Sequence, residues 1–277
     1  MARNGVRVGI ALGSHQATAL ILGRKTSSCP SVSIDLDVDG SDLRQEIRVA
    51  VGRLKAALDR TSGEATDDAV AHVTLLPPLA DARLLPFPPL RTSEVEAVLK
   101  RDVARHFLGA NRPQVVGVRM PEAKKKPGTV GSDGSIAVLA AAAPMALLEM
   151  IREVLAEVGW RGASFSAAHS AWLKAALQNQ DGSVGAIVAV VGATAHVLRL
   201  SGSDPSSVRK LPVDDVSVVA ESLSGSHGKV LLLADPQVYQ AYTTHLARQG
   251  LAAIHDSQGW NTAGESAAAR AAAVELE

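Results

Sequence analysis

The stretch VRVGIALGSHQATALILG, residues 6–23, decides how the rest of the chain is interpreted. Two apolar runs flank a short segment that contains a glycine and a serine, a pattern that predicts a β-hairpin with a tight turn. Backbone N–H groups in such a turn can grip a phosphate. Hairpins of this kind usually carry an acidic residue two positions before the glycine, but here Ala11 stands there, followed by Gly13 and Ser14. The stretch therefore predicts a nucleotide-binding shape without its carboxylate.

Composition places the chain among globular proteins and excludes several functions. The 277 residues include 28 basic and 28 acidic side chains, and this neutral balance gives no electrostatic footprint for nucleic acid. Cys29 is the only cysteine, so no internal disulfide is expected. The eight histidines show no metal-ligand spacing, and we expect no metal site. No apolar run is long enough to predict a signal peptide or a membrane span.

Strand and helix signals alternate through the first half of the chain. Alternating residues predict a third strand at 31–38, and apolar residues at helical spacing predict a helix from Ser41. A strand follows at 71–77, and then a proline-rich segment leads to a helix that starts at Ser93, with Glu96 completing a capping box. Residues 114–120 and 135–142 predict a hairpin. Helices are expected at 144–158, closed by Gly159, and at 166–177.

The opening pattern then recurs. The stretch GAIVAVVGATAHVLRLSG, residues 185–202, again predicts strand, glycine turn and strand, and setting Gly192 on Gly13 puts Val190 on Ala11. A third strand ends near residue 213, a helix follows around 214–223, and a buried strand at 229–235 precedes a last helix at 237–250. The same order of elements occurring twice predicts an internal duplication. We expect a first half at 1–183, with an inserted subdomain at about 77–143, and a second half at 184–277.

Four segments in order carry a resemblance to a known family. They are VGIALGS at 8–14, the proline-then-helix segment at 84–108, the helix pair at 147–177, and the second hairpin at 186–202. Together they resemble the actin-like ATPase superfamily, and within it the PilM and GspL type of pilus and secretion assembly protein. The resemblance implies an α/β fold of duplicated actin-like (ribonuclease H-like) domains with a small inserted α/β subdomain. The short distance from the second hairpin to residue 229 implies a reduced or missing fourth subdomain.

The chemistry of that superfamily is not preserved in these motifs. An actin-like ATPase uses carboxylates on its two hairpins to hold Mg²⁺ and to orient water, and a Gly-Gly turn to seat the nucleoside. Here Ala11 and Val190 replace the two acids, and Ala234 and Asp235 stand where the glycines are expected. Gly13, Ser14 and Gly192 remain as vestiges of the phosphate hairpins. We therefore expect neither catalysis nor a bound cofactor, ATP and Mg²⁺ included.

The resemblance also implies a function. It predicts a non-catalytic cytoplasmic scaffold, peripheral to the inner membrane, in a type IV pilus or type II secretion assembly platform. Its partner would be a membrane-anchored platform protein whose cytoplasmic tail it binds, with a link to the motor ATPase, and a homodimer stays open. Phe87, Leu90, Val98 and Phe107 are predicted to form the wall of a partner-binding groove, although each is equally suited to an ordinary core. The alternative is a divergent actin-like ATPase or small-molecule kinase with relocated acids.

Overall fold

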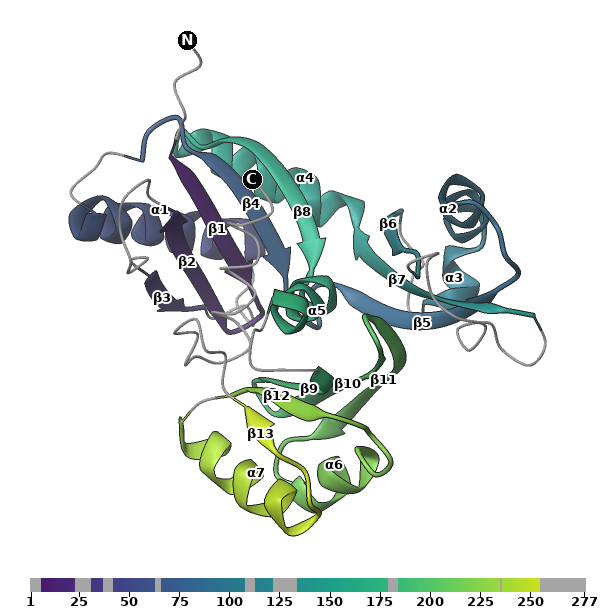
Figure 1. Cartoon of the computed structure of the whole chain (residues 1–277). Helices are drawn as coiled ribbons and strands as arrows, with labels where there is room; N and C mark the ends of the chain where they lie inside the picture. The colour runs from purple at the N-terminus through teal and green to yellow at the C-terminus, as the bar shows by residue number, and fades with distance from the viewer. Residues whose placement is uncertain are drawn as a thin grey trace. The chain divides into compact units, whose positions relative to one another are not determined.

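The computed structural model describes residues 6–22, 31–36, 42–62, 66–107, 113–121, 134–178, 184–234 and 236–254. The chain divides into two compact units. Within the described residues, the first comprises those up to residue 81 together with 143–171, and the second comprises 82–142 together with 172–254. Each unit is described by itself, and Figure 1 labels its helices and strands.

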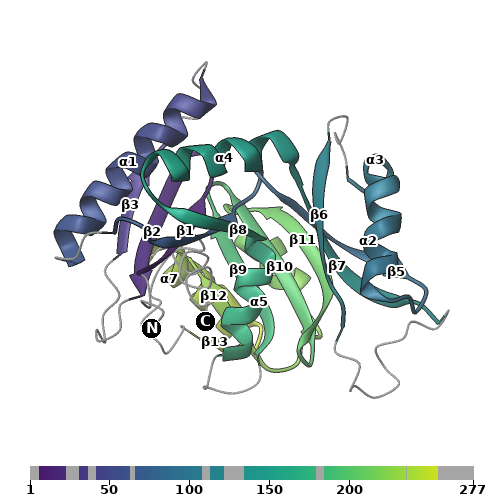
Figure 2. The ribbon, with the colours of Figure 1, turned by 90° about the horizontal axis from the view of Figure 1, so that it is seen from above.

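The first unit is built on a five-stranded sheet. Its strands, in the order β3-β2-β1-β4-β8, are β3 (Ser31–Asp35), β2 (Gln16–Leu22), β1 (Arg7–Leu12), β4 (Val70–Leu75) and β8 (Arg161–Ala167). The predicted first hairpin is confirmed, because β1 and β2 pair antiparallel, whereas β4 is parallel to both β1 and β8. Helices α1 (Leu43–Ser62) and α4 (Met145–Glu157) cover one face of this sheet, as Figure 2 shows from above.

The alternation of side chains along the strands shows which residues of the sheet face the helices. Arg152 of α4 lies over the ring of Phe165 at 4.9 Å, so Phe165 in β8 points toward α4. Its register partners across the sheet are Val73 and Ile10, which are buried and apolar. Because successive strand residues point to opposite faces, the neighbours Ala11 and Thr74 point away from the helices.

A three-stranded sheet with two short helices lies between β4 and α4 in the sequence, and we call this segment the insert. Its strands β5 (Asp81–Phe87), β7 (Ile136–Pro144) and β6 (Gln114–Arg119) lie in the order β5-β7-β6, beside α2 (Thr92–Arg101) and α3 (Val103–His106) (Figure 1). The predicted capping box at Ser93 and Glu96 is wrong by two residues, since the structure forms it at Arg91 and Glu94. Helix α2 begins at Thr92, and the backbone N–H of Arg91 donates to Glu94 Oε2 at 2.7 Å.

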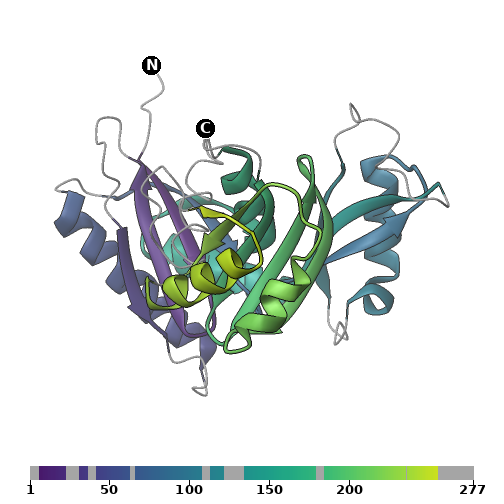
Figure 3. The ribbon, with the colours of Figure 1, turned by 60° about the horizontal axis from the view of Figure 1, so that its bottom comes forward.

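The second unit contains a second five-stranded sheet. Its strands, in the order β11-β10-β9-β12-β13, are β11 (Asp204–Pro212), β10 (Thr194–Ser201), β9 (Val184–Val191), β12 (Lys229–Leu233) and β13 (Ala253–Ile254). Helices α6 (Val216–Ser222) and α7 (Pro236–Arg248) lie on one face (Figure 3). Helix α5 (Ala168–Gln178) precedes β9, and the ring of its Trp172 lies 5.4 Å from that of His196 in β10.

The two five-stranded sheets follow the same plan. Each has two antiparallel pairings, β3-β2-β1 and β11-β10-β9, and then a parallel pairing of the central strand with β4 or β12. The insert interrupts the first set of elements between β4 and α4. At the corresponding place in the second set, β12 leads to α7 with only two residues between them.

Candidate functional site

The turn of the first hairpin is closed by its own backbone. The Gly13 N–H donates to the carbonyl of Gln16 at 2.9 Å, and the Leu76 N–H donates to the carbonyl of Leu12 at 2.9 Å. A Cβ added to Gly13 would lie 3.2 Å from Leu76 Cδ1, which is tighter than most real contacts. Gly13 is buried and Ser14 is half-buried. The glycine is therefore explained by packing as well as by any past contact with a phosphate.

Ala11 lies in the middle of a row of small side chains that crosses the sheet. Its register partners are Thr18 in β2 and Thr74 in β4, and all three side chains are at most 1% exposed. The row continues outward, since Thr18 Oγ1 lies 2.9 Å from Ser33 Oγ and Thr74 Oγ1 lies 3.0 Å from Ser166 Oγ. We call Ser33, Thr18, Thr74 and Ser166 the hydroxyl row. Its hydroxyl groups form two contacting pairs, one on each side of Ala11, and leave a methyl group where a carboxylate is expected.

A buried histidine joins the hydroxyl row at one end. The Nδ1 atom of His72 lies 2.6 Å from Ser164 Oγ, and its Nε2 atom lies 2.9 Å from Ser166 Oγ. His72 is only 5% exposed. Sequence periodicity marks this residue as part of a strand, but it gives no signal that the serines of β8, about 90 residues away, lie beside it. The cluster holds hydroxyl groups and one imidazole and, among its described members, no carboxylate that could bind Mg²⁺.

The second hairpin has a shorter turn than the first. Val191 pairs with Thr194, so Gly192 and Ala193 alone form the turn, whereas four residues separate the paired Leu12 and Ala17. Gly192 is exposed and has a φ of +54°, which L side chains rarely adopt. The carbonyl of Ala193 accepts a hydrogen bond from the Val213 N–H at 3.0 Å. Gly192 is thus required by the turn itself.

The difference in turn length changes which residue corresponds to Ala11. Val190 packs in the core beneath α6 and α7, with Val188, Val219 and Leu232. Ala11 points away from the helices of its own unit, so the alignment of Gly192 on Gly13 pairs residues that face opposite sides. Near the turn, Ala189 and Val191 of β9 point away from α6 and α7, and both are apolar. Either alignment leaves this hairpin without a carboxylate in the part of it that the structure describes.

The expected adenosine turn is described only in part. Ala234 follows β12 and is 6% exposed, packed in the same core cluster as Val190. Asp235 lies outside the described residues, and α7 begins at Pro236, as is common for proline in the first turn of a helix.

The four residues predicted for a partner groove belong to the insert core. Phe87 and Phe107 are 6% and 2% exposed, and Leu90 and Val98 are partly buried against the same cluster. That cluster also contains Val95, Leu99, Val116, Val138, Ala140 and Ala142. The two phenylalanines therefore have little surface left for a partner, and their role in binding stays a prediction.

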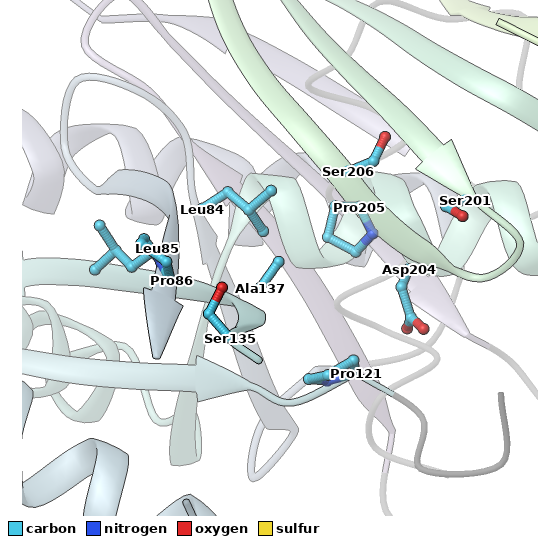
Figure 4. A pocket seen from close by; sticks show the side chains of 10 residues that line it. All are labelled: Leu84, Leu85, Pro86, Pro121, Ser135, Ala137, Ser201, Asp204, Pro205 and Ser206. Carbon is cyan, nitrogen blue, oxygen red and sulfur yellow. The ribbon is translucent and has the colours of Figure 1, made fainter. Parts of the chain in front are cut away.

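A cavity in the second unit lies elsewhere on the insert. It has a volume of about 320 Å³ and is lined from the insert by Leu84, Ser135 and Ala137, among others. Residues Ser201, Asp204, Pro205 and Ser206 of β10 and β11 line its other side, and Figure 4 shows Leu84 and Ala137 facing Pro205. No motif in the sequence signals this cavity, because its walls come from segments more than 60 residues apart.

The described residues contain no group of three histidine, cysteine or carboxylate side chains that could hold a metal ion. Among the helices that the structure describes, none is both long and apolar enough to span a bilayer.

Comparisons with known proteins relate the chain to solved structures. No protein-family model matches the sequence, and no curated protein sequence does so either. One similar structure is a chain of a PilM–PilN type IV pilus biogenesis complex, with a TM-score of 0.66, 13% identity, and coverage of 97% of this chain and 98% of that one. Another is a Bacteroides thetaiotaomicron protein with an actin-like ATPase fold and unknown function, with a TM-score of 0.59, 9% identity, and coverage of 96% and 95%.

A third structure is the cytoplasmic domain of EpsL from the type II secretion system of Vibrio cholerae, with a TM-score of 0.49, 10% identity, and coverage of 83% and 82%. The first two likenesses establish the fold. The chain has the actin-like ATPase fold, as the sequence motifs predict.

Proposed function

We propose that the chain is a non-catalytic scaffold that binds the cytoplasmic tail of a membrane-anchored partner in a type IV pilus or type II secretion assembly platform. The observation that supports this most strongly is the likeness, over nearly the whole of both chains, to a member of a pilus biogenesis complex. It would act in the cytoplasm at the inner membrane, with the motor ATPase as a second partner and a homodimer still open. We also infer that its two halves arose by internal duplication, with the fourth subdomain reduced, since both sheets share one order of elements.

The absence of hydrolysis is argued from the hairpins. Ala11 is fully buried between two threonines, and β9 presents apolar side chains on both faces. Metal-held carboxylates contribute several kcal/mol to the transition state of phosphoryl transfer, and each 1.36 kcal/mol lost lowers the rate about tenfold. A chain without them is expected to retain little activity. The divergent ATPase or kinase remains the alternative, because the fold itself is that of nucleotide-binding enzymes.

Two measurements test the proposal. Titration with Mg²⁺ and ATP should leave the thermal unfolding midpoint unchanged and give no heat in calorimetry, whereas saturable binding would favour the alternative. The second measurement uses synthetic peptides that correspond to the cytoplasmic tails of single-pass membrane proteins encoded beside this chain. We expect one of them to bind saturably in fluorescence anisotropy, and its scrambled form not to bind. Failure of every such tail would overturn the scaffold function.

A further inference from the structure

The cavity described above lies between the outer strands of two different sheets. Among the described strands, β5 is one of the two outer strands of the three-stranded sheet, and β11 is one of the two outer strands of the sheet that contains β9. Leu84, Leu85 and Pro86 of β5 line one side of the cavity, and Pro205 of β11 lines the other. An outer strand presents backbone N–H and C=O groups that can pair with an added extended chain. The cavity is therefore placed where an extended peptide can lie against a strand and insert side chains.

Proline limits where such pairing can occur. Pro86 and Pro205 have no N–H to donate, so neither strand offers an unbroken ladder beside the cavity. A bound peptide would then depend on the side chains that enter the cavity as much as on backbone pairing. The aliphatic and proline walls favour apolar side chains.

A break in strand pairing shapes the β11 side of the cavity. Leu200 pairs with Pro205 and Arg199 pairs with Ser207, so Ser206 is an extra residue in β11. The Ser206 hydroxyl donates to the carbonyl of Arg199 at 3.2 Å. Bulges of this kind redirect the side chains beside them and are frequent at sheet edges next to binding sites. Here the bulge lets consecutive residues of β11 line the same cavity.

Asp204 gives the cavity its charge. Among the described residues that line the cavity, it is the only one with an ionisable side chain, and it is 4% exposed. Ser135, Ser201 and Ser206 add hydroxyl groups to the lining. The carboxylate already interacts within the chain, but its two oxygens can accept from several donors. A guanidinium or ammonium group entering the cavity would bring the opposite charge to a carboxylate that lies in a low-dielectric setting.

We propose that this cavity binds an extended segment of a partner protein that carries an arginine or lysine among apolar residues, with the basic side chain directed to Asp204. The proposal rests on the proposed function, since it names the chemistry of the tail and the place where it binds. The negative charge of Asp204, the apolar walls and the two flanking outer strands each match one property of such a segment.

The test uses defined peptides and the full chain. The probe is a capped peptide of alternating valine and leucine residues, kept soluble by terminal glycine–serine repeats, with one central arginine, and its matched form has glutamine in place of the arginine. We expect the arginine peptide to bind roughly tenfold or more tightly than the glutamine peptide. Asp204→Asn should weaken the binding of the arginine peptide and leave the affinity of the glutamine peptide unchanged. The two peptides would then bind the variant equally, which is the result of a double-mutant cycle when the two charged groups interact.

The control is Asp214→Asn, which makes the same charge change at an exposed residue outside the cavity lining and should leave both affinities unchanged. Because Asp204→Asn could disturb folding, Ala137→Trp serves as a second variant. Its indole ring fills the cavity and should lower the affinity for both peptides. Equal binding of the two peptides to the unmodified chain would overturn the proposal. So would self-association that Asp204→Asn abolishes, because it would assign the cavity to a second copy of the chain.

The outcomes separate this proposal from the scaffold function. If a neighbouring membrane protein's tail binds but neither cavity variant affects it, the function stands and the cavity proposal fails. If the arginine peptide binds through Asp204 but no membrane-protein tail binds, the cavity proposal stands and the function fails.

Discussion

Ala11 and Thr74 are register partners on the parallel strands β1 and β4, and both side chains are fully buried. The carboxylate that an actin-like ATPase carries at this place would therefore be buried here, so its absence affects stability as well as catalysis. An aspartate at residue 11 would place a charge in a closed row of hydroxyl groups, and burying a charge without a full set of partners is costly. Ala11→Asp should therefore lower the free energy of unfolding by about 2 kcal/mol or more and should not create Mg²⁺-dependent ATP binding.

The matched control for that variant is Ala11→Ser, which extends the hydroxyl row without adding charge and should be tolerated much better. Chemical denaturation measures the stability of both, and calorimetry with Mg²⁺ and ATP measures binding. A stable Ala11→Asp variant that binds Mg²⁺ and ATP would contradict the expectation and would indicate that the rest of an ATP site is intact.

Ser166 contacts two buried groups at once, the His72 ring and the Thr74 hydroxyl. Ser166→Ala removes the oxygen that both groups contact, and we expect a loss of about 1–3 kcal/mol in the free energy of unfolding. Ser33→Ala also removes one hydroxyl group of the row, but Ser33 is exposed and water can replace it, so its cost should be clearly smaller. Urea denaturation of the two variants side by side checks the order, and equal losses would contradict it.

Gly185 allows two segments of the second unit to approach closely. A Cβ at this residue would lie 1.8 Å from the carbonyl oxygen of His227, a backbone atom that cannot swing aside. Gly185→Ala should therefore shift the His227 segment and cost about 2 kcal/mol or more in stability. Gly117 is a strand glycine with no atom within 4 Å of its added Cβ, so Gly117→Ala should be neutral or slightly stabilising. Thermal unfolding midpoints that fall equally for both variants would refute this account.

Much of the fold was predictable because its signals are local. The hairpin at residues 6–23, the two helices and the order of strands all follow from apolar spacing and turn residues. The structure confirms these elements, with the helices predicted from Ser41 and Pro144 beginning at Leu43 and Met145. The face of the sheet to which Val190 points was not predictable. The second turn is two residues shorter than the first, so Ala11 and Val190 point to opposite faces of their sheets when Gly13 is aligned with Gly192. The capping box at Ser93 was misplaced because a serine is a common N-cap, whereas the structure uses Arg91 and Glu94.

The candidate sites were harder to predict from the sequence, because they depend on which segments the tertiary structure brings together. Phe87 and Phe107 are apolar and lie near prolines, a pattern that suits a groove wall and a core equally, and only their burial separates the two. The cavity beside Asp204 combines residues of β5, β7, β10 and β11. No spacing along the chain reports that combination, because each residue alone is an ordinary member of a strand.

The last prediction concerns pH. Burial, with a smaller contribution from the charges of Asp214 and Asp215, raises the pKa of Tyr242 to about 12, above its ordinary value of 10.0. Its hydroxyl group donates to the carbonyl of Val213 at 2.9 Å. Below pH 10 the phenol is protonated in both states, so this contribution to stability is fully present. Between about pH 10 and 12 the unfolded chain loses the proton first, so the free energy of unfolding falls as the pH rises.

Tyr242→Phe tests this directly. At neutral pH the variant should be less stable by about 1 kcal/mol, because the hydrogen bond to Val213 is lost. Between pH 10 and 12 it should lose stability less steeply than the unmodified chain, because phenylalanine has no proton to release. Tyr239→Phe removes the chain's other tyrosine and should keep the steep loss. Urea denaturation at several pH values measures the slopes, and identical slopes for Tyr242→Phe and the unmodified chain would show that Tyr242 ionises as easily in the folded state as in the unfolded one.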